Sequence, residues 1–229
     1  MNTPKPNWLL TVGLIFLTLV PSIAGTLRII GLAAGGPISP ENSRFYAMPI
    51  PVVVHIISAL VYCLVGAFQF APVRRQNIIW HRRAGRVLAV AGIVAAISGL
   101  WMTVFYPLPA QLQGPLLYGV RLLVAGSMIF SIVQAWITIR RKDVPSHRAW
   151  MIRGYALGQG AGTQVFVMIP AAILLGGNVA GLLYDILMTS AWLINILIAE
   201  WIIRRKASNP SKGVRRVVPS VASVEMENG

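Results

Sequence analysis

Six long apolar runs, separated by short polar stretches, dominate the pattern of the chain. A helix needs about 20 predominantly apolar residues to cross the ~30 Å hydrocarbon layer of a membrane, and each run is close to that length. The pattern therefore predicts six transmembrane helices, near residues 8–27, 49–71, 87–106, 116–139, 150–175 and 180–203.

Composition agrees with a membrane location. The chain is 56% hydrophobic and only 11% charged, which leaves too little polar surface to cover a soluble globule of 229 residues. We therefore predict an all-α fold, a polytopic membrane helical bundle. Its transmembrane domain spans residues 1–203, with a core over residues 48–203.

Two basic segments repeat along the chain. They are VRRQNIIWHRRAGR at residues 73–86 and IRRKDVPSHRAWMIR at residues 139–153, and in both an Arg pair precedes a His-Arg pair at the same spacing. Each is interpreted as a basic loop between two spans. The repeat predicts a duplicated hairpin, spans 2–3 and 4–5, which brings His81 and His147 to the same membrane face.

The basic charge is distributed unevenly between the two faces. The net charge is +14, and if the spans alternate, every Lys and Arg lies on one side except Arg28, Arg44 and Arg121. Cytoplasmic loops of membrane proteins carry such an excess, so both termini are predicted to be cytoplasmic in a bacterial inner membrane. Anionic lipids are then the expected partners of the basic charge, and nucleic acid is not.

The chain ends and the single cysteine add little chemistry. Small residues at 22 and 24 fit a secretory cleavage site, but the apolar run continues through residues 29–30, which favours an uncleaved first span. Residues 204–229 are predicted to form a basic cytoplasmic tail that is disordered or associated with lipid. Cys63 has no mate within the chain, so a disulfide or a Cys-based metal cluster is excluded there.

Glycines recur along one side of the third and fifth spans. They are Gly85, Gly92 and Gly99 in the third span, and Gly154, Gly158 and Gly162 in the fifth. Small residues let helix backbones approach closely inside a bilayer. Both spans are therefore expected to lie centrally in the bundle.

Ionisable residues within the spans are candidates for function because they are costly to place in a membrane. The outer group is His55, Arg121 and Asp185, and the repeat aligns His55 with Arg121. Arg121 and Asp185 are expected at matching depth with opposite charge. They form either a structural ion pair between the fourth and sixth spans or part of a ligand or proton site.

The inner group contains two histidines on parallel spans. His81 and His147 could supply both axial ligands to a haem b, so haem iron is the metal we expect here. Neighbouring arginines would bind the haem propionates, namely Arg82, Arg148 and Arg153, with Glu200 as a counter-charge. Alternatively, the His-Arg pairs anchor lipid phosphate or hold another metal.

Four stretches carry a family resemblance. His55, HRRAGR at 81–86, HRAWMIRGYAL at 147–157 and WLINILIAEW at 192–201 resemble, in that order, the bacterial membrane family called domain of unknown function 2306. The resemblance covers roughly residues 48–203 and implies a multi-pass membrane protein.

The layout of spans and histidines is also similar to the ascorbate-dependent transmembrane cytochrome b family. That likeness implies a haem held by His81 and His147 on the cytoplasmic side. His55 matches one ligand of the outer haem, but Arg121 stands where its partner would be. One haem site is therefore the most that this layout allows.

These observations favour a membrane protein that carries electrons through a b-type haem, which would make it a transmembrane oxidoreductase. The outer group would then bind quinone or a small reductant. The alternatives are a non-redox transporter and an accessory or assembly subunit of a membrane complex, with other subunits or a second copy of the chain as partners. Whether the protein is an enzyme stays open at this stage.

Overall fold

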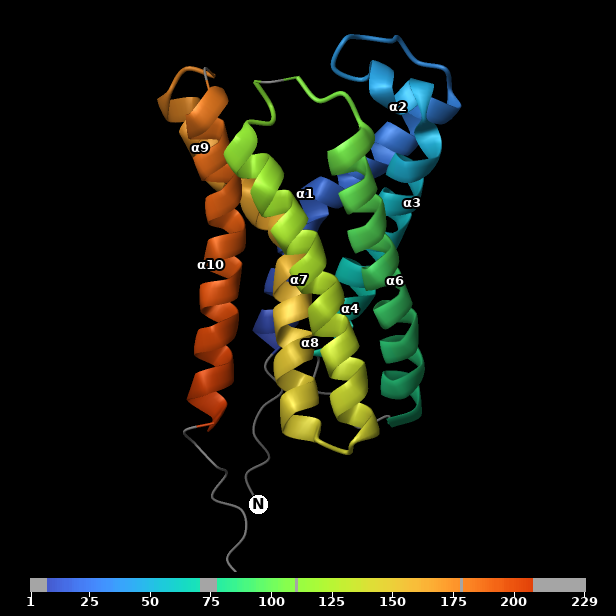
Figure 1. Cartoon of the computed structure of the whole chain (residues 1–229), viewed down its shortest axis with the longest axis vertical. Helices are drawn as coiled ribbons and strands as arrows, with labels where there is room; N and C mark the ends of the chain where they lie inside the picture. The colour runs from blue at the N-terminus through green and yellow to red at the C-terminus, as the bar shows by residue number, and fades with distance from the viewer. Residues whose placement is uncertain (1–7, 71–77, 110, 178, 208–229) are drawn as a thin grey trace, which may run out of the picture.

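The fold is a bundle of long helices lying side by side (Figure 1). The computed structural model describes residues 8–70, 78–109, 111–177 and 179–207, and these contain helices and no strand. The elements are α1 (Trp8–Ala33), α2 (Ser43–Ala47), α3 (Pro49–Leu60), the π-helical η1 (Val61–Val65), α4 (Gly66–Gln69), α6 (Ile78–Phe105), α7 (Pro115–Arg140), α8 (Val144–Gly158), α9 (Gly160–Leu174) and α10 (Gly181–Ala207).

The predicted spans correspond to these helices. Five are long and apolar enough to cross a membrane, counting α3, η1 and α4 as one span over Pro49–Gln69. Helices α8 and α9 are bent by 43° at a short break and make a sixth span if the pair is counted as one. The all-α polytopic bundle is thus confirmed, and the fifth span is a broken helix.

The basic segments are more helical than predicted. Helix α6 begins at Ile78 rather than near residue 87, so the HRRAGR sequence forms its first turns. Long arginine side chains can reach the membrane surface from within a helix, which lets the helix start early. In the second segment only the turn before α8 is a loop, and Lys142 occupies it with a positive φ of 60°.

The cap of α8 explains why that helix starts where it does. Asp143 is the N-cap residue, and its carboxylate accepts a hydrogen bond from the backbone N–H of Ser146 at 3.1 Å. Pro145 lies in the first turn, where a missing N–H costs nothing. His147 therefore lies within the first turn of α8.

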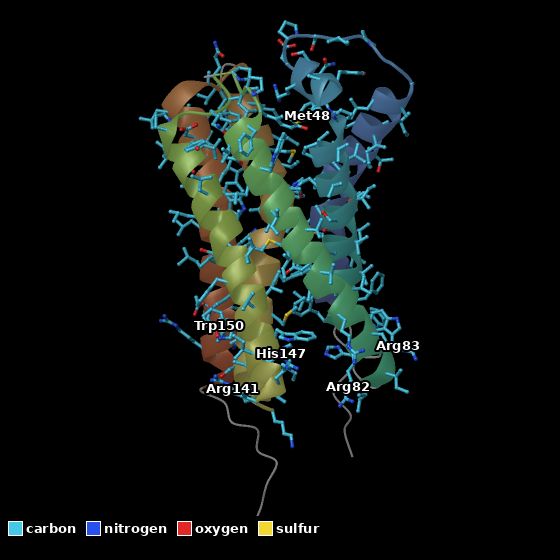
Figure 2. The ribbon with its side chains drawn as sticks, turned by 45° about the vertical axis from the view of Figure 1, so that its right-hand side comes forward. Met48, Arg82, Arg83, Arg141, His147 and Trp150 are labelled. Atoms are coloured by element: carbon cyan, nitrogen blue, oxygen red, sulfur yellow. The ribbon has the colours of Figure 1, made fainter. Side chains whose placement is uncertain are left out.

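The two hairpins have the same orientation. The starts of α6 and α8 and the end of α10 lie at one end of the bundle, and α2 lies at the other (Figure 1). Figure 2 shows Arg82, Arg83, Arg141 and His147 at that first end and Met48 at the opposite end. The basic residues thus gather on one face as predicted. That this face is cytoplasmic stays a prediction. The Arg74-Arg75 pair and the tail beyond residue 207 lie outside the described residues.

The core is built around the ring of Tyr62, which is 1% exposed. A Cβ on Gly92 of α6 would lie 2.6 Å from one edge of this ring, and a Cβ on Gly158 of α8 would lie 2.6 Å from the other. Glycine at both positions therefore admits a large aromatic side chain between the central helices. The glycine pattern marked the central helices as expected, although nothing lies within 4 Å of a Cβ on Gly85.

The break between α8 and α9 is held by buried hydrogen bonds. Nε2 of Gln159 donates a hydrogen bond to the Tyr155 hydroxyl at 2.7 Å. The side-chain oxygen of Gln159 accepts one from the Thr18 hydroxyl of α1 at 3.1 Å. The Tyr155 hydroxyl donates to the backbone carbonyl of Cys63 at 2.7 Å, within η1. These bonds satisfy polar groups that have no water partner at this depth and connect α1, η1 and the bend.

Candidate functional site

A cavity of about 410 Å³ lies among the central helices. Its volume is within the ~300–1,000 Å³ range of small-molecule sites. Its lining comes from α2, α3, η1, α6, α7, α8, α9 and α10, and most of it is apolar. The polar and aromatic residues in the wall are Arg44, Phe45, His55, Tyr62, Cys63, Thr103, Tyr106, Arg121, Gln164 and Trp192.

The cavity extends to the end of the bundle that carries α2, and we call this part of it the mouth. Arg44 of α2 is 9% exposed, and its Nε and Nη1 atoms have no hydrogen-bond partner. Burial and the neighbouring Arg28 guanidinium both lower the pKa of Arg44 from its usual value. Its charged form is thus destabilised, yet a guanidinium stays protonated in proteins, so the Nε and Nη1 donors of Arg44 are left without an acceptor.

Helix α2 and the start of α3 hold the mouth in place. The Arg44 guanidinium lies 4.5 Å from the centre of the Phe45 ring, and the Tyr106 hydroxyl donates to the backbone carbonyl of Met48 at 2.7 Å. Phe45 and Tyr106 also contact each other edge to face, with ring centroids 5.5 Å apart. The arginine is therefore positioned by packing as well as by the short helix.

Arg121 of α7 contributes a second guanidinium to the same wall. Its Nη1 donates to the side-chain oxygen of Gln113. Within the residues that the structure describes, neither Arg44 nor Arg121 lies within ion-pair distance of a carboxylate. Two cations thus line one cavity without a carboxylate in direct contact, and Glu41 and Asp185 act on them only from longer range.

Of the two alternatives expected for Arg121 and Asp185, the ion pair between them is wrong. Asp185 is 1% exposed and accepts hydrogen bonds from the backbone N–H groups of Gly114 and Leu117, each at 3.0 Å. These N–H groups lie at the start of α7 and have no partner within the helix, and a carboxylate there also complements the helix dipole. Asp185 therefore caps α7 and does not line the cavity.

His55 of α3 is half-buried and lines the cavity opposite α7. Its Nδ1 lies 2.9 Å from the backbone oxygen of Ala95 and 3.2 Å from the hydroxyl oxygen of Ser98, both on α6. A Cβ on Gly99 would come within 3.2 Å of the imidazole, so glycine there lets the ring lie against α6. His55 and Arg121 thus line one cavity, and their role as an outer site stays a prediction.

Two further residues at the deep end of the cavity have polar groups. The Tyr62 hydroxyl is buried and has no partner, whereas Gln164 of α9 donates to the backbone carbonyl of Met188 at 3.2 Å. Sequence reasoning did not select Arg44, Tyr62 or Gln164 as site residues. Tyr62 lies in a π-helical turn, a feature that often accompanies functional sites. This turn is visible only in the structure, so the sequence could not have indicated Tyr62.

The inner histidines lie at the opposite end of the bundle. His147 is half-buried, and its Nδ1 lies 2.8 Å from the backbone oxygen of Ala135 on α7. His81 is exposed in the first turns of α6. Helix α7 packs against both α6 and α8. The cavity wall includes neither His81 nor His147.

The arginines of the inner group have separate surroundings. Arg153 forms a two-pronged ion pair with Glu200 of α10, Nε to Oε1 at 2.6 Å and Nη2 to Oε2 at 3.1 Å, and also lies over the Trp150 ring. Glu200 thus acts as the predicted counter-charge. Arg82 is exposed, and Arg148 is half-buried.

The described inner end fits a haem only in part. A carbonyl bond at Nδ1 leaves Nε2 of His147 as the nitrogen that could bind iron, as haem ligation requires. His81, however, is exposed, and Arg153 already has a carboxylate partner. Among the described residues no group of three or more His, Cys, Asp or Glu side chains could hold a metal ion.

The fold and the cavity together define an all-α polytopic membrane protein with a charged pocket at one end of its bundle. The chain belongs to the family described as predicted membrane protein DUF2306, whose profile matches residues 52–203. This confirms the family resemblance seen in the sequence. No curated protein and no solved structure matches the chain, so the likeness to transmembrane cytochromes b stays a prediction.

Proposed function

We propose that this protein binds a small organic anion with an apolar body in the Arg44–Arg121 cavity, as the binding step of a membrane transporter. The single observation that carries the proposal is the pair of guanidinium groups that line one cavity without a carboxylate within ion-pair distance in the described chain. The cavity opens on the outer face if both termini are cytoplasmic, in a bacterial inner membrane.

The electrostatics favour an anion as the ligand. A charge removed from water is costly unless it is paired, and leaving one buried charge unpaired costs about 3–5 kcal/mol. The Nε and Nη1 of Arg44 are buried donors without partners. Guanidinium groups bind carboxylate and phosphate through parallel hydrogen bonds. A ligand with a carboxylate or a phosphate would therefore supply acceptors for the unpaired donors of Arg44.

The shape of the cavity favours an amphipathic ligand. Between Ala95 and Thr103 on α6 the lining extends over about 12 Å of helix rise. Arg44 lies in the short helix at the mouth, while Met128, Leu157 and other apolar side chains lie deeper. A ligand would therefore place its anionic group toward the mouth and its apolar body toward the middle of the bundle.

The broken fifth span supports transport over a purely structural role. Gly158 and Ala161, on either side of the break between α8 and α9, both line the cavity. In many transporters the substrate lies beside helices that are interrupted near the middle of the membrane, although this comparison is one of architecture. The bend gives the two halves of the span separate axes along which they can move.

Calorimetry on the protein in lipid nanodiscs tests the proposal, with octanoate as the probe and empty nanodiscs as the blank. We expect octanoate to bind and uncharged 1-octanol to bind at least tenfold more weakly. Arg121→Gln and Arg44→Gln should each weaken octanoate binding by roughly 10- to 100-fold, since a hydrogen bond to a charged group contributes about 1.5–3 kcal/mol.

The matched control is Arg28→Gln. Arg28 lies at the same end of the bundle and contacts Phe45, but it is exposed and does not line the cavity. Its replacement should change affinity by less than about threefold. Equal binding of octanoate and octanol, or equal losses in Arg28→Gln and Arg121→Gln, would reject an anion site.

Electron transfer through haem b is the second candidate, and the geometry of His147 is the observation that favours it. It predicts a reduced-minus-oxidised b-type absorption signal that disappears in both His81→Ala and His147→Ala. In that case the cavity would hold quinone or a small reductant, and ubiquinone would displace octanoate. A colourless, folded preparation rejects electron transfer through haem b. Co-purification of other chains in mild detergent would instead favour an accessory subunit of a membrane complex.

A further inference from the structure

His55 presents one unpaired acceptor to the cavity. The backbone oxygen of Ala95, 2.9 Å from Nδ1, can only accept a hydrogen bond, so Nδ1 must carry a proton. Ser98 donates its own hydroxyl hydrogen to the carbonyl of Val94 at 2.6 Å, and its oxygen is then free to accept from the same Nδ1–H. The tautomer is thereby fixed, and in the neutral ring Nε2 holds the lone pair.

No partner for that nitrogen is found in the part of the chain that the structure describes. Both hydrogen bonds of the ring involve Nδ1, and the remaining side of the half-buried ring belongs to the cavity wall. A bare nitrogen lone pair in the wall of the cavity that Arg44 and Arg121 also line cannot hydrogen-bond a carboxylate, because both atoms are acceptors. An anion that reaches His55 in this cavity therefore meets an unfavourable contact there unless a proton arrives with it.

We infer that ligand binding is coupled to proton uptake at Nε2 of His55. This inference rests on the proposed anion site. When the ligand enters as an acid, its O–H bond breaks and an N–H bond forms on Nε2, which leaves a carboxylate next to an imidazolium. When it enters as the anion, the proton is transferred to Nε2 from a buffer acid in the solvent. Either way one anion and one proton enter together, and the net charge of the cavity does not change.

The surroundings of His55 leave it as the group that exchanges this proton. The titratable and charged side chains that face the cavity from the elements packed around it are Tyr62 and Cys63 on η1, Arg44 on α2, Tyr106 after α6 and Arg121 on α7. Arg28 lies beyond Arg44 near the end of α1. Arginine stays protonated in proteins, and ordinary phenols and thiols titrate at about pH 10 and about pH 8.5, whereas an ordinary imidazole changes its charge near pH 6.5.

The test is calorimetry of octanoate binding in buffers of different ionisation enthalpy, at about pH 7.5, where an ordinary imidazole is mostly uncharged. We expect uptake of about 0.5 to 1 proton per octanoate by the unaltered protein. His55→Gln should bind octanoate with no net proton uptake, at an affinity close to that of the unaltered protein at high pH. The control Arg28→Gln should take up as many protons as the unaltered protein.

The pH dependence provides a second measurement that needs no variant. Because the bound anion favours protonated His55, octanoate affinity should be highest at low pH and should fall by up to tenfold per pH unit as pH rises from about 7 to about 9. His55→Gln should lose this dependence.

The outcomes separate the two proposals. Octanoate binding without proton uptake, proton uptake that persists in His55→Gln, or an affinity that is flat across this pH range would overturn the role of His55 and leave the anion site standing. An absence of octanoate binding at every pH would reject the anion site, and the proton coupling with it. Should His55→Gln fail to fold, the pH series on the unaltered protein decides.

Discussion

The cap that Asp185 provides for α7 yields a sharp prediction for Asp185→Asn. The carboxylate is almost fully buried and accepts one hydrogen bond from Gly114 and one from Leu117, both at 3.0 Å. Asparagine has nearly the same shape but only one acceptor oxygen. Its NH₂ group would face one of the two backbone N–H groups, and two donors repel each other.

The expected loss follows from these two bonds. A hydrogen bond to a charged acceptor contributes about 1.5–3 kcal/mol, and one between neutral groups contributes about 1 kcal/mol. Asp185→Asn loses one charged bond and weakens the other, and it also removes a negative charge from the N-terminus of α7. We therefore expect the free energy of unfolding to fall by about 2–4 kcal/mol.

The assay is equilibrium unfolding in mixed micelles of SDS and a mild detergent, with Arg121→Gln and the double variant measured alongside. Arg121 lies beyond ion-pair distance of Asp185, and only a longer-range attraction links the two side chains. The coupling energy should therefore stay below about 1 kcal/mol, well short of the loss expected for Asp185→Asn. The ion pair expected from the sequence would instead make the second substitution much less costly than the first.

Two results would refute this reasoning. An unchanged free energy of unfolding in Asp185→Asn would show that the cap contributes nothing. A coupling energy that accounts for most of the Asp185→Asn loss would restore the ion pair with Arg121. Gly114→Ala offers an independent check, because its Cβ would collide with Oδ2 of Asp185 and should disturb the same cap.

Further predictions concern the core and the α7–α8 turn. Gly158→Ala should lower the free energy of unfolding by about 1–3 kcal/mol, because its Cβ would lie 2.6 Å from the Tyr62 ring. The control Gly126→Ala, with nothing within 4 Å, should raise it by up to about 1 kcal/mol, and equal effects would argue against the Tyr62 packing. Hydrogen bonds from Ser146 lower the pKa of Asp143, so this cap stabilises the start of α8 above the usual Asp pKa of about 3.9 and is lost as pH falls through the lowered value. Amide exchange at His147, corrected for its intrinsic pH dependence, should accelerate in that acid range in the unaltered protein, whereas Asp143→Ala should exchange quickly at every pH.

Sequence periodicity and charge were sufficient for the architecture. Apolar runs of membrane-spanning length allow little except helices, because every backbone polar group in lipid must find its partner within the protein. The repeat of the basic segments likewise predicted two like-oriented hairpins and aligned His55 with Arg121. The family match over residues 52–203 agrees with the stretches that carried the resemblance.

Element boundaries and partners were not determined in this way. The sequence does not show that α6 starts among its arginines, or that the fifth span breaks at Gln159. Opposite charges at equal depth suggested that Arg121 and Asp185 pair. Asp185 of α10 instead accepts hydrogen bonds from the backbone N–H groups at the start of α7.

The candidate site shows the same division. The sequence identified His55 and Arg121 because ionisable residues stand out within apolar spans. It passed over Arg44, which belongs to a polar loop in the sequence and becomes buried only when α2 folds over the mouth of the cavity. Local composition thus determined which segments enter the membrane, while tertiary packing decided which charges lose water without gaining a partner, since that depends on residues distant in the chain.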